Sequence, residues 1–379
     1  MNPLRLQPLG AYCDGSCWEA TPLIWRDALV LVERGHQPPF RVRFQSLPGV
    51  STGNNSILLD AIPGTRDMAY VSAINHNQQA LWAFATNGDD TNPPKPVPPP
   101  QRISTTTPNR TQVHVFWSAA PSLAASSWRH SMILDVSGNE FGFKVYNTGA
   151  ALGELDGEPA YVLAVEAVFP PNSSLAVSAT TLFATCTRCA TTGDPSTGWK
   201  LLNPRKFLYT RTRYNACPTL RYYSGYWYLV SMFANVSSPR GPHSGSKSSL
   251  EGCWAQHIVR SKDLARWEES PVGGGLIMGY PDGDDLGGPD HTLMPNSLFA
   301  AHGSALARTL LRNETDDINR SDMDMVTLPS GQTFVTWLSG NQNVPTAPNP
   351  GIIGFSIAGL VEGTEEEWLR SFFEPRAFR

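Results

Sequence analysis

The chain has 379 residues, of which 29 are Lys or Arg and 33 are Asp or Glu, so its net charge is −4. This length can bury a substantial core, which excludes a disordered chain and a small disulfide-stabilised protein. The balanced charge and the lack of basic runs argue against nucleic-acid binding. No stretch of about 18 apolar residues exists to span a membrane. With 32 Gly and 32 Pro, the composition favours many short strands joined by turns.

Five segments have the apolar alternation and the polar or glycine-containing turns of β-hairpins. In chain order, the paired strands are expected at 19–25 and 28–33, 69–74 and 80–85, 145–151 and 161–168, 218–223 and 226–232, and 324–328 and 333–338. Only residues 304–312 and 364–373 have a helical pattern. The chain is therefore expected to be all-β.

An internal repeat organises these hairpins. Tryptophans mark the ends of successive units at Trp128, Trp199, Trp267 and Trp368. Their intervals are roughly 70 residues once an insertion at about 273–307, within the loop 272–314, is set aside. The resulting units are 11–62, 66–137, 140–204, 207–271 and 315–376. This period, with four short strands in each unit, predicts one domain over 1–379, a five-bladed β-propeller with four antiparallel strands per blade and a substrate pocket at the central channel. The alternative is a β-sandwich followed by a second β domain.

Two insertions interrupt the repeat. Residues 92–100 contain six prolines in nine positions, so this segment is expected to be a solvent loop. The loop at 273–288 carries Asp282, Asp284 and Asp285. This spacing suits a structural calcium ion, but the terminal Glu of a calcium-binding loop is absent, so a solvated loop is the favoured interpretation. No cofactor is expected from the sequence.

The sequence leaves the cellular compartment open. Met1–Gln7 lacks the apolar segment of a secretory signal. Six Asn-x-Ser/Thr acceptor sites nevertheless suit a glycoprotein of the secretory pathway, at Asn54, Asn109, Asn172, Asn235, Asn313 and Asn319. The Cys186–Cys189 pair has C-x-x-C spacing without a second such pair or a nearby His. A local disulfide or plain thiols are therefore favoured over zinc.

Two motifs carry a resemblance to a known group. Residues 260–268 read RSKDLARWE, and residues 216–230 form an inner hairpin that reads ACPTLRYYSGYWYLV. Both resemble blade-building motifs of five-bladed glycoside hydrolases, the superfamily of arabinanases, levansucrases and invertases (families 43 and 32). The resemblance covers all five units and is more specific for fold than for reaction. It implies a hydrolase that uses carboxylates on inner strands around the channel.

Cleavage of a glycosidic bond requires one protonated carboxyl and one carboxylate, and a third acid often tunes the donor. The first unit offers Asp14 and Glu19. The fifth unit offers Asp322 and Asp324, whose alternate positions are expected to place both side chains on one face of a strand. A salt bridge to an arginine such as Arg213 is the structural alternative for this pair. Glu166 is the only acid in an apolar strand of the third unit, which suggests either a catalytic or a satisfied structural carboxyl.

The fourth unit departs from the resemblance. Several relatives place a Glu proton donor just before the Pro that opens this inner strand, whereas this chain has Ala216-Cys217-Pro218. The proton donor is thus missing or relocated. Polar and aromatic residues expected near the mouth of the channel are candidates for binding sugar hydroxyls or stacking on sugar rings. They are Trp18, His76, Arg213, Tyr214 and Asn215.

Two functions follow from these patterns. The first is a glycoside hydrolase or transglycosidase that acts on a furanoside or another small carbohydrate or oligosaccharide, with Glu19, Asp322 and Asp324 in the chemistry and Glu166 or Asp14 tuning them. The second is a non-catalytic propeller that binds carbohydrate or a protein partner, because fold alone does not establish activity.

Overall fold

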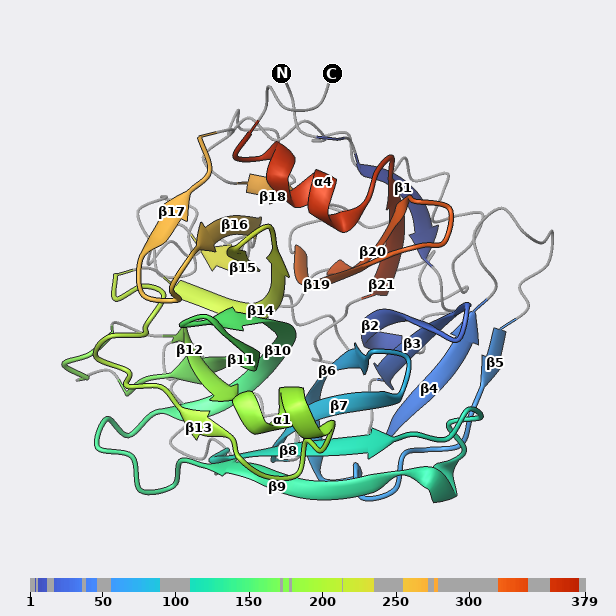
Figure 1. Cartoon of the computed structure of the whole chain (residues 1–379), viewed down its shortest axis with the longest axis horizontal. Coiled ribbons are helices and arrows are strands. Elements are labelled where there is room, and N and C mark those ends of the chain that lie inside the picture. The colour runs from blue at the N-terminus through green and yellow to red at the C-terminus, as the bar shows by residue number, and fades with distance from the viewer. Residues whose placement is uncertain are drawn as a thin grey trace, which may run out of the picture.

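The computed structural model describes much of the chain, and the remaining residues are drawn as a grey trace (Figure 1). The described residues are 4, 6–11, 17–35, 39–45, 56–88, 110–170, 173–176, 179–212, 214–234, 255–271, 276–278, 320–339 and 355–374. No helix within these residues is long and apolar enough to cross a membrane.

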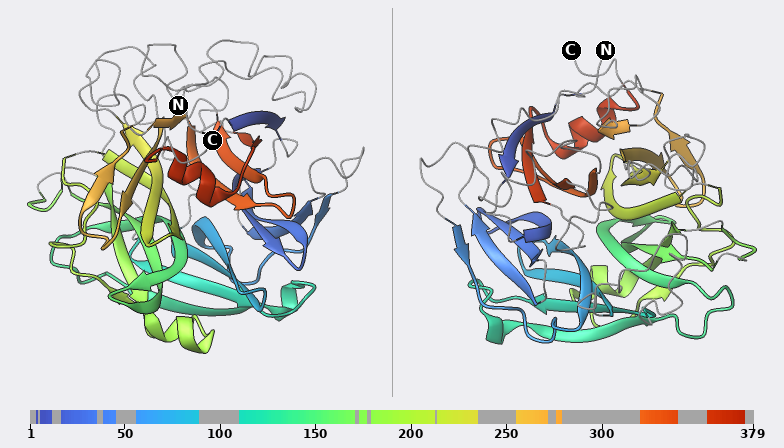
Figure 2. Two further views of the ribbon diagram at one scale, coloured as in Figure 1. Left: turned by 45° about the horizontal axis from the view of Figure 1, so that its top comes forward. Right: turned by 180° about the vertical axis from the view of Figure 1, so that it is seen from behind.

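Five antiparallel sheets stand radially around one axis, so the chain is a five-bladed β-propeller (Figures 1 and 2). The first blade consists of β2 (Cys17–Trp25), β3 (Ala28–Gly35), β4 (Phe40–Gln45) and β5 (Ser56–Leu58). The second consists of β6 (Met68–His76), β7 (Ala80–Asn87), β8 (Gln112–Ser118) and β9 (Arg129–Asp135). The third consists of β10 (Lys144–Leu155), β11 (Glu158–Val168), β12 (Ala179–Cys186) and β13 (Lys200–Leu201).

The fourth blade consists of β14 (Tyr214–Tyr223), β15 (Tyr226–Ala234), β16 (Ala255–Ser261) and β17 (Trp267–Glu269), with β18 (Leu276–Met278) also pairing with β16. The fifth contains β19 (Arg320–Thr327), β20 (Thr333–Ser339) and β21 (Phe355–Val361). Its fourth strand is β1 (Leu6–Ala11), which pairs with β21. The beginning of the chain thus completes the last sheet, a pairing that the sequence pattern did not predict.

The five expected hairpins are confirmed as the first two strands of each blade. Within the described ranges, three short helices accompany the sheets: η1 (Ala125–Ser127), α1 (Thr187–Thr192) and α4 (Glu365–Ser371). The helical pattern at 364–373 is confirmed by α4, whereas the one at 304–312 lies outside the described residues. The prolines at 92–100 and the three aspartates at 282–285 also lie outside them.

The repeated tryptophans have a common structural role in three blades. Trp128, Trp199 and Trp267 lie immediately before or at the start of the outermost strand of blades two, three and four. In each case the indole N–H donates to a backbone carbonyl three to five residues earlier, at 2.9 to 3.2 Å. Trp368 is different, because it is buried within α4. The sequence period therefore reflects a repeated corner before the outer strand.

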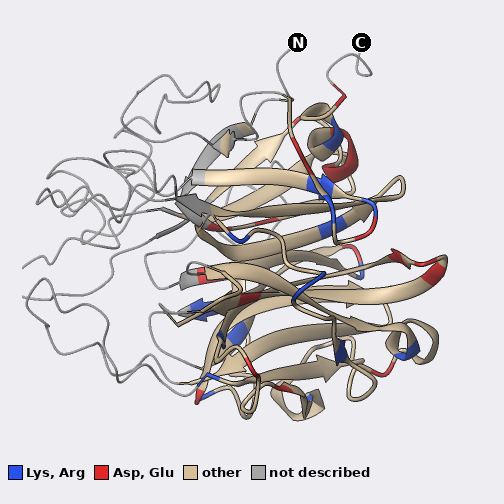
Figure 3. Ribbon diagram, turned by 90° about the vertical axis from the view of Figure 1, so that its left-hand side faces the viewer, with Lys and Arg blue, Asp and Glu red and all other residues tan. Residues whose placement is uncertain are grey.

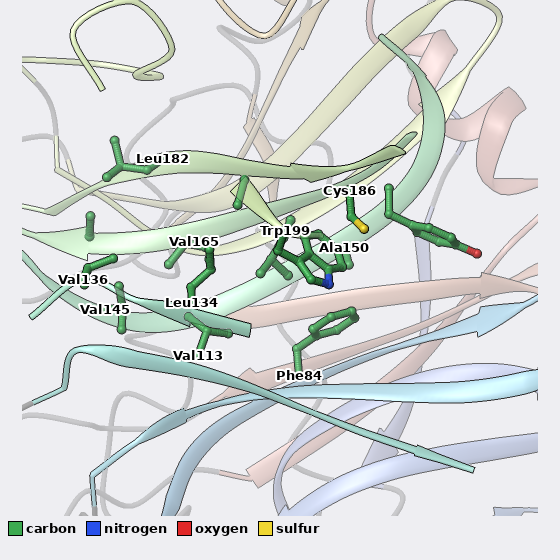
Figure 4. Close-up of a cluster of buried hydrophobic side chains, with 14 of the residues drawn as sticks. Phe84, Val113, Leu134, Val136, Val145, Ala150, Val165, Leu182, Cys186 and Trp199 are labelled. Atoms are coloured by element: carbon green, nitrogen blue, oxygen red, sulfur yellow. The ribbon is translucent and has the colours of Figure 1, made fainter. Parts of the chain in front are cut away.

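The hydrophobic core is divided among the interfaces between neighbouring blades. The cluster between blades two and three includes Phe84, Val113, Val165, Leu182 and Trp199, which point toward one another from the two sheets (Figure 4). Cys186 belongs to the same cluster and forms a disulfide with Cys189 at the start of α1. Of the two interpretations favoured for this C-x-x-C pair, a local disulfide or plain thiols, the structure has the disulfide.

Candidate active site

The innermost strand of every blade has a register shift near its start. The shifts occur in β2, β6, β10, β14 and β19. Three of them contain a non-glycine residue with positive φ: Tyr70 at 52°, Cys217 at 50° and Asp322 at 50°. Such bulges redirect side chains and are frequent beside active sites. The same end of all five strands therefore surrounds the axis with irregular backbone.

A pocket opens at this end of the axis and receives residues from all five blades. Its walls are Glu19, Ala20, Thr21, Val71, Ser72, Asn147, Thr148, Cys217, Pro218, Thr219, Asp322, Met323 and Asp324. Three of these residues are acids, and they come from the first and fifth blades. Sequence reasoning anticipated all three acids as channel residues. It missed Asn147 and four hydroxyl-bearing residues, Thr21, Ser72, Thr148 and Thr219. These residues line the pocket because they lie at or just after the bulges, and Asn, Ser and Thr at such positions have no recognisable sequence pattern.

Glu19 is buried, with 4% of its surface exposed, and lines the pocket. Its carboxyl accepts a hydrogen bond from the backbone of Val71 and lies 3.8 Å from the Arg34 guanidinium. The second oxygen, Oε2, is buried without a hydrogen-bond partner in the described part of the chain. Burial, together with the charge of Asp322, raises the pKa of Glu19 from 4.5 to about 8. Burial thus favours the protonated form of Glu19 at neutral pH.

Asp322 is half-buried at the bulge of β19 and lines the same pocket as Glu19. Its side chain is hydrogen-bonded to the Cys217 thiol, and its charge contributes to the raised pKa values of both Glu19 and Glu166. A carboxylate beside a protonated carboxyl is the pair that glycosidic cleavage needs.

Asp324 also lines the pocket, but it is engaged by protein groups. Its Oδ1 lies 2.5 Å from Arg221 Nη2 and accepts from the backbone N–H of Met325 at 2.8 Å. Burial raises the pKa of Asp324, and the nearby Arg221 opposes this rise. The structural alternative, a salt bridge to an arginine, is realised here by Arg221. Asp322 and Asp324 both line the pocket, but not through the regular alternation of a strand, because the register shifts between Ser321 and Asp324.

Glu166 lies behind the pocket lining. Its Oε2 accepts from Asn147 Nδ2 at 2.8 Å and from the backbone N–H of Cys217 at 3.0 Å. Burial raises the pKa of this carboxyl from 4.5 to about 7. The side chain joins blade three to the bulge of blade four, so its contacts suit a residue that holds the pocket wall.

Cys217 occupies the position just before Pro218 and is the free cysteine found among the described residues. Its Sγ accepts from Asn147 Nδ2 at 3.2 Å. Burial raises the pKa of the thiol well above 9. A thiol with this pKa stays protonated at neutral pH and is a weak acid, so it does not reproduce the chemistry of a carboxylic proton donor.

The expected sugar-binding residues have diverse positions. Tyr214 is half-buried near Glu166 and Cys217, and burial raises its pKa well above 10. Asn215 is fully buried, with its amide bonded to Thr181 Oγ1 at 2.5 Å and to Ser231 Oγ.

His76 is not among the residues that line the pocket. It lies at the end of β6, where its ring bonds to the Tyr161 hydroxyl at 2.5 Å and stacks on Trp82. Asp14, Arg213 and the side chain of Trp18 fall outside the described residues, as do all six glycosylation acceptor sites.

Within the described ranges, no group of three or more His, Cys, Asp or Glu side chains is arranged to hold a metal ion. The pocket acids themselves are spread around one wall and are bonded to Val71, Cys217 and Arg221. The chemistry that this arrangement can perform with its own groups is proton donation by a buried acid beside a carboxylate.

No protein-family model matches this chain, and no curated protein matches its sequence. Solved structures of similar fold are nevertheless numerous. A catalytic domain of the GH62 α-L-arabinofuranosidase from Coprinopsis cinerea is 7% identical, with a TM-score of 0.53 over 96% of this chain and 98% of its own.

The α-L-arabinofuranosidase PaAbf62A from Podospora anserina is also 7% identical, with a TM-score of 0.51 over the same shares of the two chains. The BT0996 protein, solved as a complex with RGII, is 10% identical, with a TM-score of 0.54 over 95% of this chain and 92% of its own. At these identities the likeness concerns the fold. The resemblance to the five-bladed glycoside hydrolases is thus confirmed as a shared propeller architecture.

Proposed function

We propose that this chain is a glycoside hydrolase or transglycosidase whose chemistry takes place between Glu19 and Asp322. The observation that carries the proposal is the state of Glu19. Its Oε2 is buried in the pocket wall without a hydrogen-bond partner among the described groups, and its pKa of about 8 keeps it protonated. A raised carboxyl pKa beside a second acid is the pattern of a glycosidase proton donor.

In the proposed reaction, Glu19 donates its proton to the glycosidic oxygen as the bond to the anomeric carbon breaks. The carboxylate of Asp322 either attacks that carbon or takes a proton from the attacking water. The departing alcohol leaves neutral, because it receives the proton of Glu19. Polar side chains of the pocket wall, among them Ser72, Asn147 and Thr148, are proposed to bind sugar hydroxyls, because they line the same pocket.

Asp324 and Glu166 are given supporting roles in this proposal. Asp324 is bonded to Arg221, and Glu166 is bonded to Asn147 and to the backbone of Cys217. Asp324 also accepts from Thr21, and Glu166 from the backbone of Asn147. Neither side chain has a buried oxygen without a hydrogen-bond partner among the described groups, as Glu19 does. The substrate is proposed to be a small glycoside or the end of an oligosaccharide, and arabinofuranosides are the first compounds to test because two proteins of similar fold are arabinofuranosidases.

The test is turnover of aryl glycosides by the wild type and by Glu19→Gln. Loss of a general acid lowers the rate by about 10²–10⁴-fold, and the loss is greatest for poor leaving groups, which need the proton most. Glu33→Gln is the matched control, because Glu33 is also a buried acid of the first blade but pairs with Arg43 on β4, away from the pocket lining. Equal rates for Glu19→Gln and the wild type would exclude Glu19 as the donor.

A second function is favoured by one observation in the fourth blade. The position before Pro218 holds a protonated thiol, Cys217, where several of the resembling enzymes carry a Glu. This substitution suits a propeller that binds a carbohydrate without cleaving it. Calorimetric binding of an oligosaccharide without release of product over a long incubation would favour binding alone over the hydrolase.

A further inference from the structure

A chain of buried charges leads from the pocket to the C-terminal helix. Arg221, on β14, is the central group. Its Nη2 donates to Asp324 Oδ1 at 2.5 Å and to the backbone carbonyl of Met325 at 2.7 Å, and its Nε donates to Glu365 Oε1 at 2.9 Å. One guanidinium therefore joins blade four, the pocket strand of blade five and α4.

Glu365 is itself firmly held. It lies in the first turn of α4, where acidic residues suit the positive end of the helix dipole. Acidic residues, coloured red, are visible on the helix near the C-terminus in Figure 3. Its Oε2 accepts from the Tyr223 hydroxyl at 2.9 Å, and its backbone N–H donates to Thr327 Oγ1 at 2.9 Å. The helix is fixed in turn by the capping box of Thr364 and by burial of Trp368.

These contacts act on the segment just after the bulge that carries Asp322. The hydroxyl of Thr219 donates to the Met323 carbonyl, and Arg221 binds the next two residues, Asp324 and Met325. Both donors are on β14. Asp322 has a φ of 50°, a conformation that is unfavourable in a non-glycine residue and persists only when its surroundings hold it.

We propose that Arg221 is a positioning residue for the pocket, and that Glu365 of α4 orients it, so that the two set the place of Asp322. The planar fork of arginine suits this task, because it bonds two carboxylates and a carbonyl in fixed directions. This inference rests on the proposed function for its catalytic consequence. Its structural consequence, an ordered bulge beside Cys217, can be measured without any turnover.

Arg260 provides a matched control within the same blade. It is also buried and bonds two carboxylates, Glu268 at 2.9 Å and Glu374 at 3.0 Å. Glu374 follows α4, so Arg260 joins blade four to the C-terminal segment as Arg221 does. Its partners do not line the pocket. The two arginines thus differ in that Arg221 bonds the residues that follow Asp322, whereas Arg260 does not.

The experiment compares the wild type with Arg221→Lys, Glu365→Gln and Arg260→Lys. The first readout is the alkylation rate of Cys217 by iodoacetamide, followed by peptide mass mapping so that other cysteines do not contribute. The thiol is hydrogen-bonded to Asp322, so displacement of the bulge exposes it. We expect alkylation about tenfold faster in Arg221→Lys and Glu365→Gln, and less than about twofold faster in Arg260→Lys despite a similar loss of thermal stability.

The second readout is kcat and its pH profile on whichever glycoside the wild type cleaves. Displacement of a reacting group by about 1 Å lowers the rate by about 10²-fold, with a smaller effect on KM. Because the charge of Asp322 raises the pKa of Glu19, its displacement also moves the alkaline limb to lower pH. Arg260→Lys leaves both kcat and this limb unchanged.

The outcomes separate the two proposals. If the wild type cleaves no glycoside and Cys217 is still exposed selectively by Arg221→Lys and Glu365→Gln, the proposed function fails and the positioning role stands. If these variants alkylate no faster than Arg260→Lys, the positioning role is overturned whatever the activity. Should Arg221→Lys fail to fold, Glu365→Gln and Tyr223→Phe decide the question, since each retains the Arg221 side chain and alters only the contacts that orient it. Both are expected to alkylate faster than Arg260→Lys, and equal rates would overturn the positioning role.

Discussion

The charge of Asp322 on the fifth blade raises the pKa of Glu19 on the first blade. The two residues are at opposite ends of the sequence, and the closed ring brings them to one pocket. Burial is the larger cause of the raised pKa, and Asp322 is the next. The state of the proposed proton donor therefore depends on a residue that the proposed reaction also uses.

The coupling between these two acids can be tested directly. In Asp322→Asn, one cause of the raised pKa is removed, so Glu19 should titrate below the wild-type value of about 8. The titration can be followed by NMR of carboxyl-labelled glutamate, with the Glu19 signal assigned by its loss in Glu19→Gln. Asp135→Asn, an exposed change on β9, should leave the titration unaltered. An unshifted Glu19 signal in Asp322→Asn would show that the two groups do not interact.

The stability of the protein should fall as pH rises from about 6.5 to about 8. Below this range His76, His114 and His130, whose pKa values burial lowers from 6.5, have the opposite effect on stability. In the folded state the pKa is about 8 for Glu19 and about 7 for Glu166, whereas both titrate near 4.5 when unfolded. Between these values the folded state binds more protons than the unfolded state, so the free energy of unfolding decreases with pH. Each unit of upward shift corresponds to about 1.4 kcal/mol.

Urea unfolding at several pH values measures this slope. The variant Glu19→Gln, which carries no titrating group at this position, should show a flatter dependence than the wild type. Stability that rises over this range would contradict the burial of protonated Glu19 and Glu166.

Close contact between the third and fourth blades depends on Gly149. A Cβ at this position would clash with the backbone oxygen of Pro218, which forms part of the pocket wall. Gly149→Ala must therefore push apart two innermost strands, with an expected loss of about 3 kcal/mol and lower turnover. Gly138→Ala is the control, since its Cβ would meet no atom within 4 Å. Thermal unfolding of both variants provides the comparison.

Replacement of Glu166 should affect stability more than chemistry. In the wild type, Glu166 accepts hydrogen bonds from the side chain and the backbone of Asn147 and from the backbone of Cys217. In Glu166→Gln, one of the two accepting oxygens becomes an NH2 group, which cannot accept. We expect a loss of about 1–3 kcal/mol, the usual result of an unsatisfied buried group. Turnover should fall far less than in Glu19→Gln. An equal loss of turnover in the two variants, at equal stability, would assign Glu166 to the chemistry.

Local patterns were sufficient to predict the propeller. Each hairpin combines alternating apolar residues with a short turn, and the repeated tryptophans mark a corner that recurs in successive blades. Such signals are contained within about ten residues and need no knowledge of distant neighbours. The strand β1 escaped prediction because its partner is β21, at the other end of the chain.

For the candidate site, the sequence allowed the acidic residues to be predicted but not the contacts that they make. Glu19 and Asp322 were recognised as acids that a strand does not otherwise need. No local pattern indicates that Arg221 engages Asp324 or that Glu166 turns toward Asn147. Both facts depend on bulges, which shift the register by one residue and so reverse the direction of side chains that follow.

The pairing of β1 with β21 also has a consequence for biosynthesis. The fifth sheet cannot be completed until β21, which ends at Val361, has been synthesised and can pair with β1, which begins at Leu6. During translation the early blades can fold one after another. Glu19 and Asp322 come together only when the fifth blade has formed and the propeller has closed. For most of its synthesis, the nascent chain therefore contains Glu19, the proposed proton donor, but not yet Asp322, the carboxylate that it is proposed to act with.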